Sequence, residues 1–582
     1  MLDTDPGRLS VLVQDWLDCF GQALASGDPG QIAQLFHTEC WWRDAVAFTG
    51  TLETVAGREA VAGGLVRHTA GKAASSFRLD PARIAPAQVA RAGSEAIEAF
   101  FRFEMGPGTG EGVLRLTPDG DGRYLGWTLL TALDQIRGRE ARVGANRRRG
   151  QSYSRDFSGP NWLDKRREAA AYAERDPAVL VVGGGQAGLA VAARLTVMGV
   201  DTLIVDREAR IGDNWRRRYH ALTLHNLIYA NHLPYMPFPD NWPVYIPKDM
   251  LANWFEAYAD ALELNFWTST ELLGGSYDDG AGCWTVRVRL ADGSTREMRP
   301  RHVVMATGVS GIPNRPAIPT LDAFRGRVMH SHEFTDGGEW RGRSAIVIGT
   351  GNSGHDIAQD LHSSGARVTI VQRSPTLIVN IEPSAQLAYA LYEEGPSLEE
   401  CDLIVTGTPF PLVRRTHIGL TERSREIDKP LLDRLEARGF RLDFGEDGSG
   451  WQFKYLTRGG GYYFNVGSSD LIADGHVGLA QMDEIDGFEA DGARLKDGGR
   501  LPADLVVLAT GYRPQEELVE RLFGAEVTAR VGPIWGFGDE SELRAMFRAS
   551  GQPGLWFIAG SLAQCRIYSR YLAQQIALSE PG

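Results

Sequence analysis

The sequence predicts an α/β protein built on two Rossmann-like dinucleotide-binding domains, the second inserted in the first, behind a small N-terminal α+β domain. Three observations predict this class. Glycine-rich turns follow two buried strands, as GGGQAG at 183–188 and GTGNSG at 349–354. The motif ATG ends two further apolar strands, at 306–308 and 509–511, so that it brackets the second turn. Residues 1–140 show helical and then strand periodicity.

The composition is that of an ordinary multidomain globular protein of 582 residues, 43% hydrophobic and 23% charged. A net charge of −13 repels nucleic acid and anionic membranes at long range, so we expect a small-molecule substrate and neither of those partners. The five cysteines stand far apart with no CxxC pair, which indicates reduced thiols, a cytoplasmic location and no redox disulfide. We expect no signal peptide, no membrane anchor and no metal site.

The first domain, residues 1–140, is expected to place its helices before a curved antiparallel sheet. Helices are predicted at 9–25, 32–36 and 59–68, and strands at 41–48, 96–103, 112–116 and 123–132. This order resembles the NTF2-like (SnoaL-like) cone fold, and HTECWWRDAVAFTG at 37–50 suits the entry to its sheet.

Four residues of that segment, His37, Trp41, Trp42 and Asp44, are candidates to line a pocket. Some relatives of the cone fold use an Asp/His pair as acid and base. The alternatives are core or rim positions in a domain that docks, forms a homodimer or shields the substrate. We expect alanine at His37 and Asp44 to leave turnover largely intact.

The first glycine turn is the fingerprint GxGxxG, set between the buried strand 178–182 and a small-residue helix. Its glycines permit a tight turn, a close approach of backbone to pyrophosphate, and close packing of helix on strand. The helix N-terminus offers free N–H groups to the phosphates. Asp206 ends the next strand, where a carboxylate accepts hydrogen bonds from ribose hydroxyls and repels a 2′-phosphate, so we expect FAD or NAD. The residues expected to bind it are Gly183, Gly185, Gln186, Ala187, Gly188, Asp206, Arg207 and Trp215.

The second turn repeats this device with the opposite charge. Its following strand, 367–371, ends at Gln372, Arg373 and Ser374, with no carboxylate. Arginine and serine there favour the 2′-phosphate of NADP, so the simplest interpretation is FAD in the first site and NADPH in the second. The alternative is a structural repeat without a ligand. The remaining residues expected to bind cofactor are Gly349, Gly351, Asn352, Ser353, Gly354, Arg373, Ser374 and Thr510.

These motifs divide the chain after residue 140. A polar, arginine-rich linker is predicted at 141–175, an FAD-binding domain at 176–335 and 505–582, and an NADPH-binding domain at 336–504. We expect 381–465 to cover the substrate pocket, although nothing in that stretch indicates a charge or a shape.

The segment FRGRVMHSHEF, 324–334, carries Phe324, Gly326, His330 and Phe334 in the arrangement FxGxxxHxxx(F/Y). It resembles the signature of the flavin-containing monooxygenases, and with both fingerprints and both ATG motifs the resemblance covers 178–575. The N-terminal extension is similar to that of type II enzymes, some of which perform Baeyer–Villiger oxidations. The better-known Baeyer–Villiger enzymes end this signature in Trp-Pro, whereas Thr335 follows Phe334 here.

The resemblance implies a reaction in which NADPH reduces FAD and O₂ adds to the reduced flavin as a C4a-(hydro)peroxide. Oxygen then passes to N or S of a small organic substrate or, alternatively, to a ketone in a Baeyer–Villiger reaction. Asn226, in LHNLIY, falls where the family places an asparagine near that peroxide, although it also suits a loop-ordering role. His330 is carried over as a residue that supports NADP⁺ retention rather than as an acid or base.

Two further functions compete with oxygenation. One is a flavin reductase or NADPH oxidase that releases only H₂O₂. The other is a non-enzymatic interaction module that carries a degenerate flavoprotein. Flavin colour, bleaching by NADPH and detection of an oxygenated product separate these functions.

Overall fold

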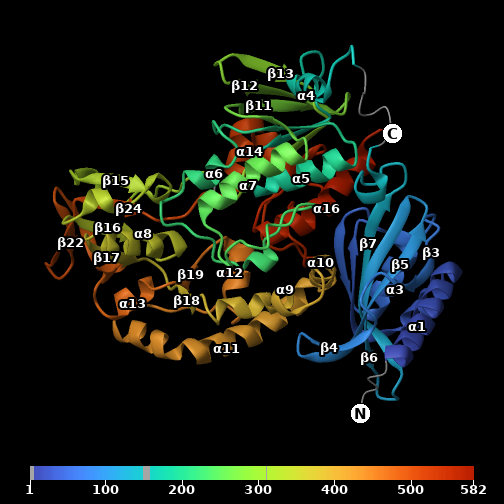
Figure 1. Ribbon diagram of the computed structural model, residues 1–582. Helices are drawn as coiled ribbons and strands as arrows, with labels where there is room; N and C mark the ends of the chain where they lie inside the picture. The colour runs from blue at the N-terminus through green and yellow to red at the C-terminus, as the bar shows by residue number, and fades with distance from the viewer. Residues whose placement is uncertain (1–5, 149–156, 310, 582) are drawn as a thin grey trace.

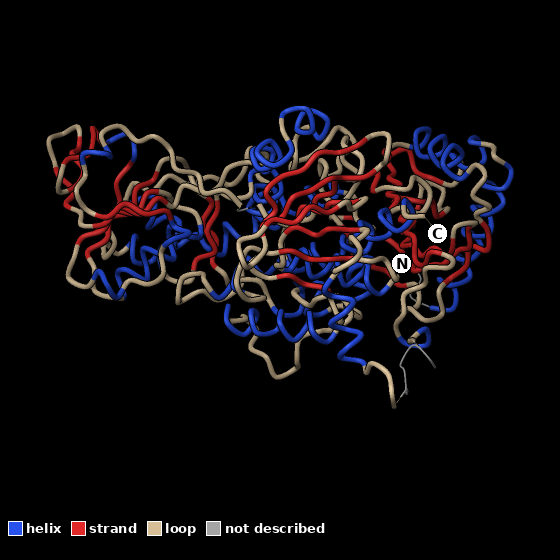
Figure 2. Tube along the Cα trace, turned by 90° about the horizontal axis from the view of Figure 1, so that it is seen from above, coloured by secondary structure: helices blue, strands red, loops and turns tan. Residues whose placement is uncertain are grey.

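The computed structural model describes residues 6–148, 157–309 and 311–581. They form two parallel sheets, one mainly antiparallel sheet, three smaller sheets and the helices packed around them (Figure 1). The N-terminal sheet and the second parallel sheet lie at opposite ends of the molecule, with the first parallel sheet between them. Figure 2 shows the second parallel sheet and its helices as a lobe on the left. Residues 149–156 of the predicted linker, Arg149 among them, lie outside the described residues.

The N-terminal unit is a seven-stranded sheet in the order β2-β1-β7-β6-β5-β3, with β4 paired to β5. Only β1 and β7 pair in parallel. Its strands are β1 (Phe36–Ala45), β2 (Leu52–Ala56), β3 (Ser75–Leu79), β4 (Ala87–Arg91), β5 (Ser94–Met105), β6 (Gly108–Pro118) and β7 (Tyr124–Ile136). Its helices are α1 (Pro6–Ser26), α2 (Pro29–Ala33) and α3 (Arg58–Thr69).

The helix predicted at 32–36 lies earlier in the chain, at Pro29–Ala33, and β1 begins at Phe36. The helix starts at Pro29 because the Asp28 side chain accepts the Gly30 N–H at 2.8 Å and Pro29 fits the first turn. The short strands β2, β3 and β4 were not predicted, because each has only five residues and a weak alternation of polar and apolar side chains.

Aromatic side chains fill the face of this sheet that α1 covers. Phe20 of α1 lies 5.1 Å from Phe77, and Phe77 stacks on Phe103 at 5.2 Å between ring centres. The Phe103 and Phe101 rings lie directly on the backbone of Gly110 and Gly112, where a Cβ atom would come within 2.1 and 2.4 Å of them. This face is therefore a packed core.

The first parallel sheet has the order β10-β9-β8-β14-β25. Its strands are β8 (Val179–Val182), β9 (Thr202–Val205), β10 (Asn265–Trp267), β14 (His302–Met305) and β25 (Leu555–Phe557). The helices with it are α5 (Gln186–Val197), α6 (Asp213–Arg216), α7 (Lys248–Ala261) and α16 (Leu562–Ser579). The alanine and glycine residues of α5 are buried, and this small-residue surface lets α5 pack closely on β8 and α16.

The second parallel sheet has the order β15-β24-β16-β17-β20. Its strands are β15 (Arg327–His330), β16 (Ser344–Ile348), β17 (Arg367–Gln372), β20 (Gly478–Gln481) and β24 (Leu505–Leu508), and α8 (Asn352–Ser363) follows β16. The predicted boundaries at 335 and 505 left β15 and β24 with the first domain, whereas both pair in this second sheet. The apolar strand pattern does not reveal which sheet a strand joins.

The remaining elements surround the two lobes. Three small sheets contain β11 (Glu271–Asp278), β12 (Cys283–Arg289) and β13 (Thr295–Met298); β18 (Leu377–Asn380) and β19 (Tyr462–Asn465); and β21 (Ile485–Glu489), β22 (Gly492–Leu495) and β23 (Arg500–Pro502). The helices are α4 (Trp162–Ala171), α9 (Ala390–Glu394), α10 (Leu398–Thr406), α11 (Phe410–Ala437), α12 (Gly450–Arg458), α13 (Ser468–Ala473), α14 (Gln515–Phe523) and α15 (Ala525–Val531). Helix α4 lies inside the stretch predicted as a linker, where a full capping box at Asn161 starts it.

Candidate active site

The first glycine turn is shaped as a nucleotide cradle. Gly183 has a φ of +107°, and a Cβ atom there would lie 2.6 Å from the Ala306 carbonyl oxygen of the first ATG motif. A Cβ atom on Gly188 would lie 1.9 Å from the Gly183 carbonyl oxygen. Helix α5 starts after Gly185 with no side-chain cap, so the N–H groups of its first turn, in Gln186, Ala187 and Gly188, point to the cradle uncapped.

Asp206 stands beside this turn at the end of β9. Its two carboxylate oxygens accept the backbone N–H groups of Gly184, at 2.6 Å, and Glu208, at 2.8 Å. These bonds orient the carboxylate and leave lone pairs on both oxygens for ribose hydroxyls. The neighbouring Arg207 is exposed, and its guanidinium faces Glu208 at 3.7 Å.

Gln186 links three segments that are far apart in the sequence. Its amide nitrogen donates to the Gly560 carbonyl at 3.2 Å, and its amide oxygen accepts from the Trp215 indole at 3.3 Å. Gly560, with a φ of +118°, follows the last strand of the sheet. The sequence placed Gln186 among the residues expected to bind the first nucleotide, and in the structure its side chain connects Gly560 and Trp215 at the edge of the cradle.

The second turn has the same construction. Gly349 has a φ of +114°, and a Cβ atom there would lie 2.3 Å from the Ala509 carbonyl oxygen of the second ATG motif. A Cβ atom on Gly354 would lie 2.0 Å from the Gly349 carbonyl oxygen. Helix α8 starts after Gly351 without a side-chain cap, so its first-turn N–H groups, in Asn352, Ser353 and Gly354, shape a second cradle that could bind phosphates.

The end of β17 decides the charge of the second cradle. Gln372 is fully buried and exchanges hydrogen bonds with the Arg441 backbone, at 2.9 and 2.8 Å. Arg373 and Ser374 are exposed and adjacent, with 3.4 Å between Nε and Oγ. Within the described residues no carboxylate pairs with Arg373, so this end of the sheet presents an uncompensated guanidinium.

Asn352 does not face open space. Its side-chain oxygen accepts the Phe464 N–H at 3.0 Å and so attaches the start of α8 to β19. Thr510 has a similar holding role in the second ATG motif. Its hydroxyl donates to the Asn314 carbonyl at 2.5 Å, and the Asn314 amide donates to the Thr510 carbonyl at 3.3 Å.

His330 is fully buried at the end of β15 and is held by backbone groups on both sides. Nε2 lies 3.0 Å from the Gly511 carbonyl, and Nδ1 accepts the His332 N–H at 3.2 Å. This pairing requires a neutral ring with the proton on Nε2, and burial lowers the pKa of His330. No ring nitrogen remains for acid–base work, so the geometry supports a positioning role at the second ATG motif.

A hydrogen bond between Tyr219 and Asp356 was not predicted from the sequence. Tyr219 follows α6, and its hydroxyl donates to the Asp356 carboxylate in the first two turns of α8. Burial raises the pKa of Asp356 to about 6, although the Tyr219 hydrogen bond opposes this effect. The contact joins the two nucleotide lobes, and two isolated residues 137 apart give no sequence signal.

The loop that contains Asn226 lies between the lobes. His225 is in edge contact with Phe464 at 4.8 Å, and the Gln386 amide donates to the His225 carbonyl at 3.0 Å. Asn226 is half-buried, and no hydrogen bond from the described residues occupies its side-chain amide. Its carbonyl accepts the side-chain amide of buried Asn231 at 3.0 Å, so the Asn226 backbone is fixed while its amide is free.

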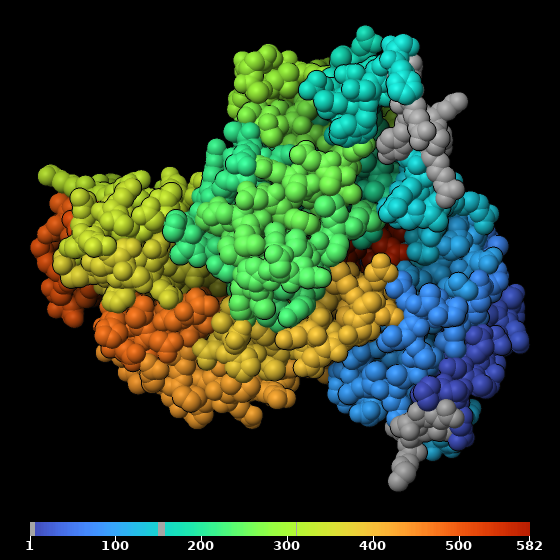
Figure 3. Space-filling view, in the orientation of Figure 1, coloured from blue at the N-terminus to red at the C-terminus, as the bar shows by residue number. Residues whose placement is uncertain are grey.

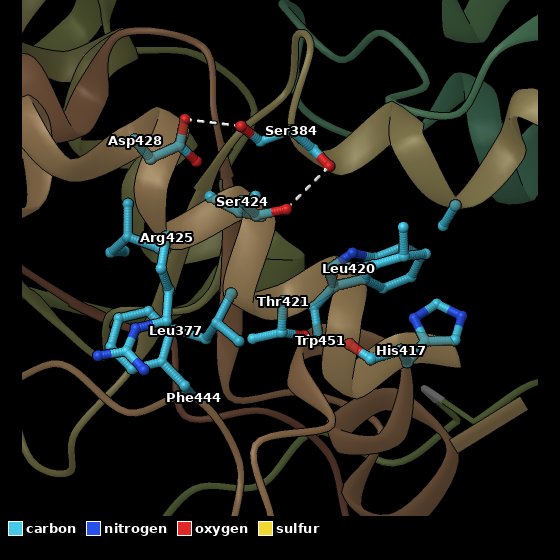
Figure 4. Close-up of a pocket in the computed structure, with 13 residues that line it drawn as sticks. Leu377, Ser384, His417, Leu420, Thr421, Ser424, Arg425, Asp428, Phe444 and Trp451 are labelled. Carbon is cyan, nitrogen blue, oxygen red and sulfur yellow. Dashed lines mark hydrogen bonds between the residues drawn. The ribbon is translucent and has the colours of Figure 1, made fainter. Parts of the chain in front are cut away.

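A pocket between α11 and β18 falls within 381–465 and the strand before it (Figure 4). Ser384 bridges two residues of α11: its hydroxyl donates to Asp428 at 2.7 Å, and its carbonyl accepts from Ser424 at 3.3 Å. Trp451 forms another wall and touches Phe464 at 4.9 Å. The glycine turns do not line this pocket.

The N-terminal candidates do not form an acid–base pair. His37 and Asp44 are seven positions apart on one extended strand, roughly 20 Å at the rise of a β-strand. Asp44 is buried and accepts four donors, from Phe48, Thr49 and Thr131. Burial outweighs those bonds and raises the pKa of Asp44 to about 6.

Trp41 and Trp42 point to opposite faces of β1. Trp42 donates to Thr131 at 2.8 Å within the aromatic core. Trp41 packs against Trp127 and Leu412 on the outer face, where the N-terminal sheet meets the rest of the chain.

Two nucleotide cradles on two connected parallel sheets define a pyridine-nucleotide-dependent flavoprotein oxidoreductase. Comparison with known proteins agrees with this class. The family model described as pyridine nucleotide-disulphide oxidoreductase matches residues 180–394. All five cysteines are free thiols in this structure.

Two curated relatives are plant monooxygenases. Indole-3-pyruvate monooxygenase YUCCA1 of Oryza sativa subsp. japonica is 30% identical over 339 residues, which cover 58% of this chain and 77% of the relative. Probable indole-3-pyruvate monooxygenase YUCCA9 of Arabidopsis thaliana is 31% identical over 337 residues, 57% of this chain and 74% of the relative. The chain therefore belongs to the flavin-dependent monooxygenase family.

The fold agrees with a solved structure titled oxidized steroid monooxygenase bound to NADP. The TM-score is 0.50 at 20% identity, with 69% of this chain and 84% of that chain covered. The protein is an FAD- and NADPH-dependent monooxygenase, and its two uncapped cradles fit those cofactors. Among the described residues, no helix has both the length and the apolar character needed to span a membrane.

Proposed function

We propose that this enzyme transfers one oxygen atom from O₂ to a nitrogen or sulfur atom of a small organic substrate. The observation that carries the cofactor part of the proposal is the pair of matched cradles, with Asp206 at one and Arg373 with Ser374 at the other, while transfer to nitrogen or sulfur rests on the resemblance to the flavin-containing monooxygenases. Asp206 suits the unphosphorylated ribose of FAD, and Arg373 suits the 2′-phosphate of NADPH. When bound, FAD supplies the electron transfer and O₂ activation that amino-acid side chains lack.

The residues of the chain bind and orient the cofactors and protect the reacting atoms. The first turns of α5 and α8 would offer their uncapped N–H groups to the two pyrophosphates. Asn226 would present an amide that can donate and accept hydrogen bonds at the reacting oxygen, because no group among the described residues occupies that amide. His330 holds the second ATG motif, and the bond between Tyr219 and Asp356 keeps the lobes together.

A second candidate is oxygen insertion beside a carbonyl, as in a Baeyer–Villiger reaction. The observation in its favour is the name of the two relatives, which act on indole-3-pyruvate, a 2-oxo acid. Such a substrate presents an electrophilic carbonyl carbon, whereas an amine or thioether presents a nucleophilic atom.

One panel separates these functions. The purified holoenzyme is given NADPH and, in turn, an aryl thioether, a cyclic ketone and an aryl 2-oxo acid, with product mass and H₂O₂ recorded beside NADPH consumption. A sulfoxide supports the first proposal, and a lactone or a decarboxylated acid supports the second. If H₂O₂ equals the NADPH consumed with every compound, both are wrong and the enzyme is an NADPH oxidase.

We also propose the following organisation. The N-terminal unit is an NTF2-like cone, supported by its three helices and curved seven-stranded sheet, and its filled interior supports docking rather than catalysis. The FAD unit spans 176 to about 324 and resumes after β24, since β15 and β24 pair with the NADPH sheet. Five free thiols support a reducing, cytoplasmic location. Helices α10 and α16 cover the outer face of the N-terminal sheet, so a homodimer would have to form through another surface.

A further inference from the structure

We infer that the N-terminal unit positions the loop 226–232 through helix α10, and so controls how well oxygen activation is coupled to substrate. The inference rests on the proposed role of Asn226. Figure 3 shows the N-terminal unit, in blue, pressed against the gold segment that contains α10. Three groups of buried or partly buried polar contacts connect the N-terminal unit to α10 and α10 to the loop.

Two buried arginines of the N-terminal sheet hold the C-terminal end of α10. Arg43, 1% exposed, donates to the Thr406 carbonyl at 2.9 Å. Arg115, fully buried, donates to the carbonyls of Gly407 at 2.7 Å and Ile404 at 3.1 Å. A helix C-terminus has unpaired carbonyls and a negative dipole end, so two guanidinium groups stabilise α10 at this position.

Each of these arginines has its own buried counter-ion. Arg43 forms a bidentate salt bridge with Glu542, at 2.7 and 2.8 Å. Glu542 also accepts a hydrogen bond from the Thr54 hydroxyl at 2.6 Å. Arg115 pairs with Glu98 at 2.8 Å. Buried ion pairs of this kind contribute more to orientation than to net stability, which suits a rigid joint between two units.

The N-terminal unit also touches the start of the same helix. The side chain of Glu400, in the first turn of α10, accepts the Ile84 N–H at 2.7 Å and completes a capping box with Ser397. Helix α10 is thus held at both ends by the N-terminal unit.

The middle of α10 holds the loop. Asp402 forms a bidentate salt bridge with Arg566 of α16, at 2.8 and 2.7 Å. The Arg566 side chain is only 3% exposed. The same guanidinium donates to the carbonyls of Ala230 at 2.6 Å and His232 at 2.9 Å. Asn231, between those two residues, donates to the Asn226 carbonyl.

These contacts form one continuous path from the N-terminal sheet to the proposed oxygen-binding amide. Arg43, Arg115, Asp402 and Arg566 act through other residues, so they are positioning residues. A shift of α10 moves Asp402, which changes the direction of the Arg566 guanidinium and with it the carbonyls that fix the loop. A path of packed ion pairs and hydrogen bonds is the physical means by which such a shift is transmitted.

The test uses the full-length holoenzyme and two variants. Arg43→Met with Glu542→Gln removes the pair at α10 without leaving a lone buried charge, and Asp402→Asn keeps the shape of its side chain while it removes the charge. Arg78→Met, at the exposed pair with Glu104, is the matched control. Amide hydrogen exchange is measured in 226–232, where Ile228 and Ala230 donate to backbone carbonyls. Exchange in α5 serves as the reference for global stability.

Both variants are expected to raise exchange in the loop about tenfold, with α5 and the control unchanged. They are also expected to raise H₂O₂ release several-fold at an unchanged anaerobic rate of flavin reduction by NADPH. Unchanged loop exchange in both folded variants overturns the inference. Faster loop exchange without extra H₂O₂ shows instead that the path exists and that the proposed role of Asn226 is wrong.

Discussion

Arg373 makes the most direct test of the charge contrast between the two cradles. The substitution is Arg373→Gln, which keeps a polar side chain of similar length and removes the positive charge. Because Arg373 is exposed and has no carboxylate partner among the described residues, the substitution breaks no ion pair and is expected to leave folding intact.

The magnitude follows from the contact that is lost. A guanidinium bound to the 2′-phosphate makes charge-assisted hydrogen bonds, which contribute about 1.5–3 kcal/mol. At about 1.4 kcal/mol for each factor of ten, the KM for NADPH is expected to rise roughly 10- to 150-fold. The KM for NADH should change less than about twofold, because NADH offers no phosphate at this position.

The assay is steady-state NADPH and NADH oxidation with the purified flavoprotein, supported by direct binding of NADP⁺. Arg441→Gln is the matched control, because Arg441 lies next to the same strand end but pairs with Asp483 at 3.0 Å. If Arg373→Gln and the control change the ratio of the two KM values equally, Arg373 does not recognise the phosphate and the assignment of the second cradle to NADPH is wrong.

Three further predictions concern the flavin, the coupling and the pH dependence. Asp206→Ala removes the acceptor for two backbone N–H groups and the ribose, so FAD is expected to bind roughly tenfold to a hundredfold more weakly; full retention of flavin absorbance through gel filtration would contradict this. Asn226→Ala is expected to lower the ratio of product to H₂O₂ about tenfold at an unchanged rate of flavin reduction, and an unchanged ratio removes Asn226 from the mechanism. Burial alone would raise the pKa of Glu580, but hydrogen bonds from Arg301 and His302 outweigh it and lower the pKa from 4.5 to about 2. Its contribution, roughly 1–2 kcal/mol after allowance for solvent, is therefore complete above pH 4.5 and lost as the pH falls toward 2. Thermal melts of Glu580→Gln between pH 3 and 7 should show a smaller acid-induced loss of stability than the parent, and parallel curves refute the assignment.

The glycine turns were predictable because their requirement is local. Gly183 and Gly349 both have positive φ, and each leaves no room for a Cβ atom beside the carbonyl of an ATG alanine. A short-range steric rule of this kind is written directly in the spacing of glycines. The acidic and basic strand ends at Asp206 and Arg373 follow from the same local register.

His330 shows where local reasoning reaches its limit. The signature identified the residue, and the structure adds that both ring nitrogens are used by backbone groups, one of them 181 residues away. The placement of β15 and β24 was missed for a related reason, since a buried parallel strand reads as the same apolar run in either sheet.

The sequence by itself determined the two glycine turns, the opposite charges at the strand ends beside them and the family, because each depends on residues within one strand-turn-helix unit. Only the tertiary structure decided how the units are joined: Tyr219 to Asp356 between the lobes, and Arg43 and Arg115 through α10 to Arg566 and the Asn226 loop. Those partners are separated by more than 100 residues in the chain. Their pairing depends on burial and geometry, which arise only when the sheets have packed against one another.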